Sequence, residues 1–131
     1  MATWQDVTEY VRSHYKIAGE EKGLMIKLVF ETGEMRSQLV LLTHHTLLDD
    51  AEEWLQISSP VASLGQVNLE KFLEEVGDTV CGGGALVGDL LIVRHAVPLL
   101  NLNINEFERP LTLVTTTADR LERELVGGDK Y

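Results

Sequence analysis

The polar and apolar positions at the start of the chain follow a helical period. Apolar residues mark one face at steps of three and four, namely Trp4, Val7, Val11 and Tyr15. Thr3 stands before them as a candidate N-cap, with Asp6 in the reciprocal position of a capping box. Gly19 lies where such a helix has already ended. These signals predict a short amphipathic helix that packs on a sheet.

The spacing then changes to a period of two, which is typical of strands. In residues 24–30, one side carries Leu24, Ile26, Leu28 and Phe30, and the other side carries Met25, Lys27 and Val29. A turn at 31–34 leads into an apolar strand at 36–43, so the two runs predict an antiparallel hairpin. A third, short strand is expected at 54–59, with Pro60 helping to end it.

A second helix is predicted after this group of strands. Asn68 is a good N-cap, and apolar residues follow it at positions i, i+3, i+4 and i+7, namely Leu69, Phe72, Leu73 and Val76. The run Cys81-Gly82-Gly83-Gly84 then leads into an apolar strand. Glycines in a strand indicate a place where another element approaches closely, or a flexible entry to the strand.

A second hairpin is expected from strands at 85–87 and 90–97, joined by a turn at Gly88 and Asp89. Residues 90–93 are continuously apolar, which indicates a strand covered on both faces. In a chain of this size, such coverage requires helices on both sides of the sheet or a partner subunit.

The longest amphipathic helix is predicted at the end of the chain. Its apolar face comprises Phe107, Leu111, Val114, Ala118, Leu121 and Leu125. Asn103 or Asn105 is expected to cap it. Pro110 predicts either a kink or a short first turn followed by a main helix that starts near Pro110. Gly127 and Gly128 are expected to end the helix before a loose tail at 129–131.

Composition and charge narrow the class of protein. With 131 residues, of which 44% are hydrophobic and 24% charged, the chain is expected to form one domain over residues 1–131. Its net charge of −10 disfavours nucleic acid and anionic membranes as partners, because both are bound through clustered Lys and Arg. Charges, Pro98 and glycines interrupt residues 76–102, which excludes a membrane span there. A single cysteine, Cys81, and an N-terminus without signal-peptide features predict a cytoplasmic location.

Three segments resemble parts of known metal-binding or phosphate-binding motifs, but each lacks residues that the motif requires. The acidic segment 46–53 lacks the alternating ligands and the glycine of a calcium loop, so a solvated connection is expected there. His44 and His45 are adjacent on a strand and point to opposite faces, which makes joint chelation of one ion difficult. The glycine run is not followed by the residues of a phosphate-binding loop. No metal and no cofactor are therefore expected.

His95 is the remaining candidate for catalysis, since it lies beside a predicted buried strand. A nucleophile would have to join it, yet Cys81 is the sole thiol and no serine stands in the setting of a nucleophile elbow. A structural or surface histidine is the favoured interpretation, and no enzyme is expected.

The predicted order is helix, three strands, helix, two strands, helix, which defines an α+β domain with an antiparallel sheet covered by helices. In this order, and in four segments, the chain resembles the type III secretion chaperone-like superfamily, which includes YbjN-type proteins. The segments are WLQISSPV at 54–61, NLEKFLEEV at 68–76, LLIVRHAVPL at 90–99 and ADRLERELVGG at 118–128.

The resemblance implies a small acidic homodimer that binds an extended segment of a client protein without enzymatic chemistry. Candidate dimer contacts carried over from it are Leu69, Phe72, Leu73, Val76, Leu90 and Ile92. Candidate client contacts are Met25, Lys27 and Val29, on the face opposite the expected core. The alternative function is a regulatory or structural domain that dimerises or docks in a multi-protein system and has no chaperone activity.

Overall fold

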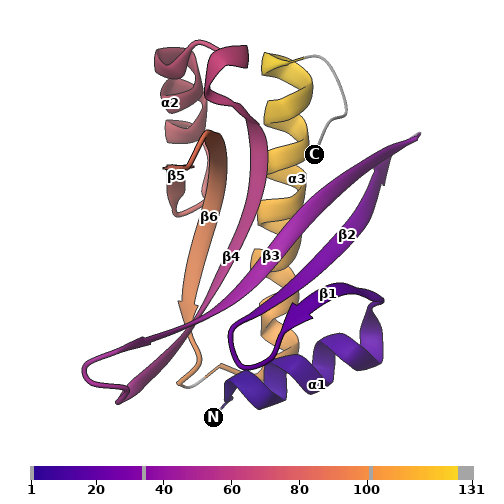
Figure 1. Ribbon diagram of the computed structural model, residues 1–131, viewed down its shortest axis with the longest axis vertical. Helices are drawn as coiled ribbons and strands as arrows, with labels where there is room; N and C mark the ends of the chain where they lie inside the picture. Colours follow the sequence, from indigo (N-terminus) through magenta and orange to yellow (C-terminus); the bar gives the residue numbers. More distant parts are fainter. Residues whose placement is uncertain (1, 34, 101, 127–131) are drawn as a thin grey trace.

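The computed structural model describes residues 2–33, 35–100 and 102–126 and has α+β architecture (Figure 1). Its elements are α1 (Trp4–His14), β1 (Ile17–Glu21), β2 (Met25–Gly33), β3 (Arg36–Leu47), β4 (Glu52–Ser63), α2 (Leu69–Gly77), β5 (Gly83–Val87), β6 (Leu90–Pro98) and α3 (Glu108–Leu125). Two 3₁₀ turns, Leu64–Gln66 and Ile104–Phe107, precede α2 and α3. The six strands form one antiparallel sheet in the order β1-β2-β3-β4-β6-β5.

The first helix has the predicted start. The Thr3 hydroxyl accepts a hydrogen bond from the Asp6 backbone N–H, and the Asp6 carboxylate accepts one from the Thr3 backbone N–H. Strand β1, which follows, was not predicted. Its sequence, Ile-Ala-Gly-Glu-Glu, lacks a run of alternating apolar residues, and pairing with β2 is what extends it. The first group therefore has four strands and not three.

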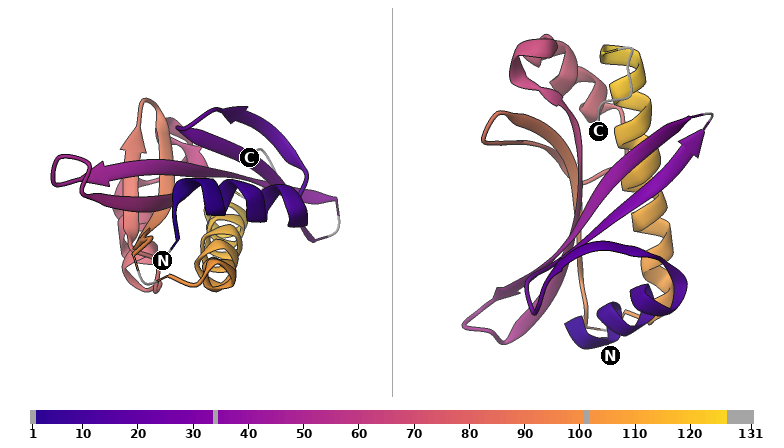
Figure 2. Two further views of the ribbon diagram at one scale, coloured as in Figure 1. Left: turned by 90° about the horizontal axis from the view of Figure 1, so that it is seen from below. Right: turned by 45° about the vertical axis from the view of Figure 1, so that its right-hand side comes forward.

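The three helices bury their apolar side chains against the same face of the sheet, and α3 runs along this face (Figure 2). Trp4, Val7 and Val11 of α1, Phe72 and Val76 of α2, and the apolar stripe of α3 share one core with alternate residues of the strands. No helix among the described residues covers the opposite face, here called the open face. The sheet is therefore covered by helices on one side.

Strand β6 is buried on both faces, as its apolar run predicted, but helices on two sides are not the cause. Leu91 and Val93 face the helices, whereas Ile92 faces the open side and is 8% exposed. The cross-strand partners of Ile92 are Pro60 and Ala85, which flank it. Neighbouring strands in the sheet therefore shield Ile92.

Pro60 does not end β4, contrary to the prediction. The strand continues to Ser63, and its register with β6 shifts between Pro60 and Ala62. A bulge of this kind accommodates a residue that has no backbone N–H to donate to a ladder.

The start of α3 places Pro110 where a helix tolerates proline. Phe107 is the N-cap, and Pro110 falls in the first turn, where the missing backbone N–H has no intrahelical acceptor to lose. The predicted short turn followed by a main helix near Pro110 is confirmed. The predicted capping by Asn103 or Asn105 is wrong, because Asn103 precedes the 3₁₀ turn and not α3. The expected helix end at 127–128 and tail at 129–131 lie outside the described residues.

The β5–β6 hairpin explains the glycine run. Gly88 has φ +60°, in the left-handed region that suits the first position of a tight turn. At Gly84, a Cβ atom would lie 2.8 Å from Cε2 of Phe72, so the ring of Phe72 packs directly on the backbone. This is the close approach that the glycines predicted.

The acidic segment 46–53 is more ordered than the solvated connection that was expected. Strands β3 and β4 continue through it as a two-stranded ribbon, with Leu47 paired to Glu52. Neighbouring strands reach only Thr43 and Trp54, so residues 45–53 project beyond the sheet (Figure 1). We call this projection the β3–β4 finger. Its turn holds Leu48, Asp49 and Asp50 at φ +54°, +54° and +67°.

Candidate protein-binding surfaces

The open face of the sheet carries a row of apolar side chains across its strands. Val29 pairs with Leu39, and Pro60, Ile92 and Ala85 are successive partners on β4, β6 and β5. Val29 is 53% exposed, while Leu39 is half-buried. Pro60 and Ile92 are buried, so the accessible apolar area of the row is at Val29 and Leu39, beside the exposed Lys27.

The three predicted client contacts all lie on this face. Met25, Lys27 and Val29 alternate with the buried Ile26 and Leu28 along β2. Lys27 and Val29 are exposed and Met25 is half-buried. Their placement opposite the helices follows directly from the period of two.

The predicted dimer contacts are divided between the core and the surface. Phe72, Val76 and Ile92 are 1%, 7% and 8% exposed, so contacts within the chain already cover their side chains. Leu69 and Leu73 are 45% and 55% exposed on the outer side of α2, and Leu90 is half-buried.

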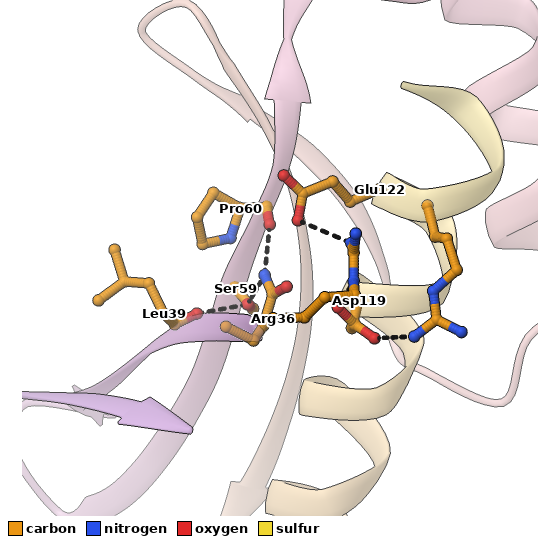
Figure 3. Close-up of polar contacts among 8 residues, drawn as sticks. Arg36, Leu39, Ser59, Pro60, Asp119 and Glu122 are labelled. Carbon is orange, nitrogen blue, oxygen red and sulfur yellow. Dashed lines mark hydrogen bonds and ion pairs between the residues drawn. The ribbon is translucent and has the colours of Figure 1, made fainter. Parts of the chain in front are cut away.

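A buried group of charged residues, which the sequence did not reveal, joins β3 to α3 (Figure 3). Arg36 Nε lies 3.2 Å from Asp119 Oδ1, and Arg36 Nη2 lies 3.7 Å from Glu122 Oε1. Arg123 reaches the second oxygen of Asp119 at 2.5 Å. The side chains of Asp119 and Glu122 are 5% and 0% exposed. Two arginines thus face two carboxylates, and the formal charges of the cluster cancel.

The electrostatic surroundings of Asp119 favour its ionised form. Burial of the carboxylate acts to raise its pKa, but the neighbouring Thr32 hydroxyl, Arg36 and Arg123 more than offset this, so the pKa of Asp119 is lowered. Beside this cluster, the buried Gln38 amide donates to Ser59 Oγ and to the Pro60 carbonyl, both at 2.8 Å (Figure 3). Ser59 in turn donates to the Leu39 carbonyl. These contacts fix the bulged part of β4 against β3.

A groove of about 550 Å³ lies between β2 and α3, next to the charged cluster. Its cations are Arg120 and Arg123. Arg120 pairs with Glu124 at 3.3 Å and Arg123 with Asp119. Because internal carboxylates engage both arginines, the groove offers no preformed site for an anion.

Two tyrosines converge on one carboxylate at the base of α3. The hydroxyl of Tyr10 donates to Glu108 Oε1 at 2.8 Å, and that of Tyr15 donates to Glu108 Oε2. Burial, followed by the hydrogen bond with Glu108, raises the pKa of Tyr15. The ring of Tyr10 packs edge-on against Phe107, so the cluster joins α1 to the start of α3.

The histidines are distributed among separate places. His44 stacks on Trp4, and its Nε2 lies 3.0 Å from Glu53 Oε1, while the neighbouring His45 is exposed. His95 is half-buried on the helix side of β6, and its Nδ1 has no hydrogen-bond partner within the described part of the chain. Across residues 2–33, 35–100 and 102–126, no group of three or more His, Cys, Asp or Glu residues could hold a metal ion.

No model of a known protein family matches the chain, and no curated protein is significantly similar to it. Within the part of the chain that the structure describes, none of the helices combines the length and apolar character needed to cross a membrane.

Proposed function

We propose that the protein is a non-enzymatic, homodimeric protein-binding module of the chaperone-like type, which holds an extended segment of a client protein in the cytoplasm. One observation carries the proposal. The helices cover one face of the sheet, and the open face presents the exposed Val29 and the half-buried Leu39 at the β2–β3 end of its apolar row. An extended polypeptide can lay alternate side chains on such a surface.

The arrangement of elements supports the same class. An acidic α+β domain with a long C-terminal helix on its sheet fits the expectation drawn from the type III secretion chaperone-like and YbjN-like proteins. The net charge of −10 favours client segments that are basic or neutral.

Co-purification from the native host tests the proposal. Tagged wild-type protein should retain a polypeptide in a fixed ratio, identified by mass spectrometry. Replacing the exposed Val29 by Asp should release that polypeptide and leave the circular dichroism spectrum unchanged. Val80→Asp, the same change at a 79% exposed position between α2 and β5, is the matched control and should retain it. Wild-type protein that retains no polypeptide, or equal retention by the two variants, would refute the role of the open face.

The alternative is a regulatory or structural docking domain without chaperone activity. The ion pairs of Arg36 with Asp119 and Glu122 fix β3 on α3. A rigid arrangement of this kind suits a domain that docks on a folded partner. Comparing the binding of an isolated client peptide with the binding of the whole folded partner would distinguish the two functions. A chaperone-like module should bind a peptide that contains only the client segment, whereas a docking domain should require the folded partner.

A further inference from the structure

A second apolar surface lies at the end of the sheet where β5 is too short to cover β6. Pairing of β5 with β6 stops at Gly83 and Arg94, so residues 95–98 of β6 are paired with β4 alone. Between this part of β6 and the first half of α3 is a groove of about 750 Å³. Its lining residues are His95, Val97, Leu102, Glu106, Arg109, Pro110 and Leu113. We call it the β6–α3 groove.

A cation without an ion pair borders this groove. Arg109 on α3 is exposed and has no carboxylate within 4.0 Å among the described residues. The one acid of the lining, Glu106, accepts a hydrogen bond from the Asn103 side chain at 2.9 Å. In a chain of net charge −10, a groove that carries the unpaired Arg109 is suited to an acidic occupant.

The β3–β4 finger has the complementary character. Leu47 and Leu48 at its tip are 50% and 72% exposed. Four acidic residues follow them in the sequence, namely Asp49, Asp50, Glu52 and Glu53, and Glu52 accepts a hydrogen bond from Trp54. Asp50 accepts a hydrogen bond from Thr46, and Glu53 faces His44, whereas Asp49 makes no such contact with any described residue. The tip therefore presents apolar side chains together with an acidic group that is free to pair.

The finger and the groove lie close together in the fold. Trp54, at the base of the finger, pairs with Pro98, which adjoins the groove residue Val97. From this base the finger extends about 10 Å at the ordinary rise of a strand. A two-fold axis beside the paired ends of β4 and β6 can thus set each finger on the groove of the other copy, which gives a closed dimer with two identical contacts.

We propose that a second copy of this chain occupies the β6–α3 groove, with its finger residues Leu47 and Leu48 on the apolar lining and its Asp49 beside Arg109. The inference rests on the proposed function, because it assigns the contact of the proposed homodimer. It moves that contact away from α2, where Phe72 and Val76 serve the chain's own core and only Leu69 and Leu73 are well exposed.

Sedimentation equilibrium of the full chain tests the proposal through a charge exchange. Arg109→Glu and Asp49→Lys should each weaken dimerisation at least tenfold, because each brings like charges together at both contacts. The double variant restores opposite charges and should recover most of the wild-type affinity. Leu48→Ser should weaken the dimer without changing any charge.

Matched controls separate local from general charge effects. Lys16→Glu and Asp89→Lys make the same changes of charge at exposed positions outside the finger and the groove, and they should leave dimerisation unchanged. Leu73→Asp on α2 should also leave it unchanged.

The outcomes distinguish this inference from the proposed function. A dimer that Leu73→Asp dissociates and the charge exchange does not affect would overturn the finger contact and leave the proposed homodimer in place. A wild-type chain that is monomeric at all concentrations would overturn both the contact and the homodimer. Binding of an acidic client in the groove would appear as a monomer whose client is released by Arg109→Glu, and it too would overturn the inference.

Discussion

Arg36 is the residue whose removal tests the buried charges most directly. Its guanidinium lies between β3 and α3 and is 17% exposed, and it faces Asp119 and Glu122, which are almost fully buried. Arg36→Met keeps most of the side-chain volume and removes the charge. Breaking a buried ion pair from one side costs about 3–5 kcal/mol, and we expect about 3 kcal/mol because Arg123 still reaches Asp119.

Urea unfolding at neutral pH, followed by circular dichroism, measures this loss. Arg120→Met is the matched control. It also removes a guanidinium that is paired with a carboxylate of α3, but Arg120 and Glu124 are 45% and 48% exposed, so the free energy of unfolding should change by no more than about 0.5 kcal/mol.

The effect of pH provides a second criterion. Because the folded-state pKa of Asp119 is lowered, its contribution to stability is fully present above the ordinary carboxyl value of 3.8 and is lost as the pH falls through the folded-state pKa. The difference between wild type and Arg36→Met should therefore narrow in acid. A loss below about 1 kcal/mol at neutral pH would show that the cluster is not an important source of stability. A larger loss that does not change with pH would show that it does not come from the ionised carboxylates.

Three further predictions concern local contacts. Thr3→Ala removes half of the capping box and should lower the free energy of unfolding by about 1 kcal/mol, measured by urea titration. Gly84→Val places side-chain atoms against the Phe72 ring and should cost about 1–3 kcal/mol, with Phe72→Leu in the same chain recovering part of the loss. In an ultraviolet titration at alkaline pH, Tyr15 should lose its proton at a higher pH than an ordinary tyrosine. Because its folded-state pKa is raised, the stability from Tyr15 is fully present below its unfolded pKa of about 10 and is lost as the pH rises through the folded value. In the Tyr15→Phe variant, the deprotonation step at high pH that belongs to Tyr15 should be absent.

Elements whose conformation depends on neighbouring residues in the sequence could be predicted from the sequence alone. The capping box at Thr3, the cap at Asn68 and the apolar stripe of α3 are contained within a few turns of chain, and the structure confirms them. The face that Met25, Lys27 and Val29 occupy follows from the same local logic.

Features that depend on contacts between distant residues could not be predicted in this way. Strand β1 is extended because β2 pairs with it, and Pro60 stays within β4 because a bulge against β6 accommodates it. The charged cluster brings Arg36 to Asp119 across 83 positions of the chain. No spacing in the sequence indicates such a contact, although an arginine at the start of an otherwise apolar strand was a possible signal.

Because α3 follows every strand of the sheet in the sequence, the core is completed only after all the strands have been made. Strands β1 to β4 are consecutive neighbours and can pair as soon as they are synthesised, whereas β6 must return to β4 across α2 and β5. The apolar face of this sheet is closed by α3, which contacts β2, β3, β4 and β6 and is the last described element to leave the ribosome. Until α3 is made, α1 and α2 alone cover the core face of the sheet. Stalling of synthesis within residues 108–125 would therefore leave the part of this face that α3 covers exposed, which is a state prone to aggregation.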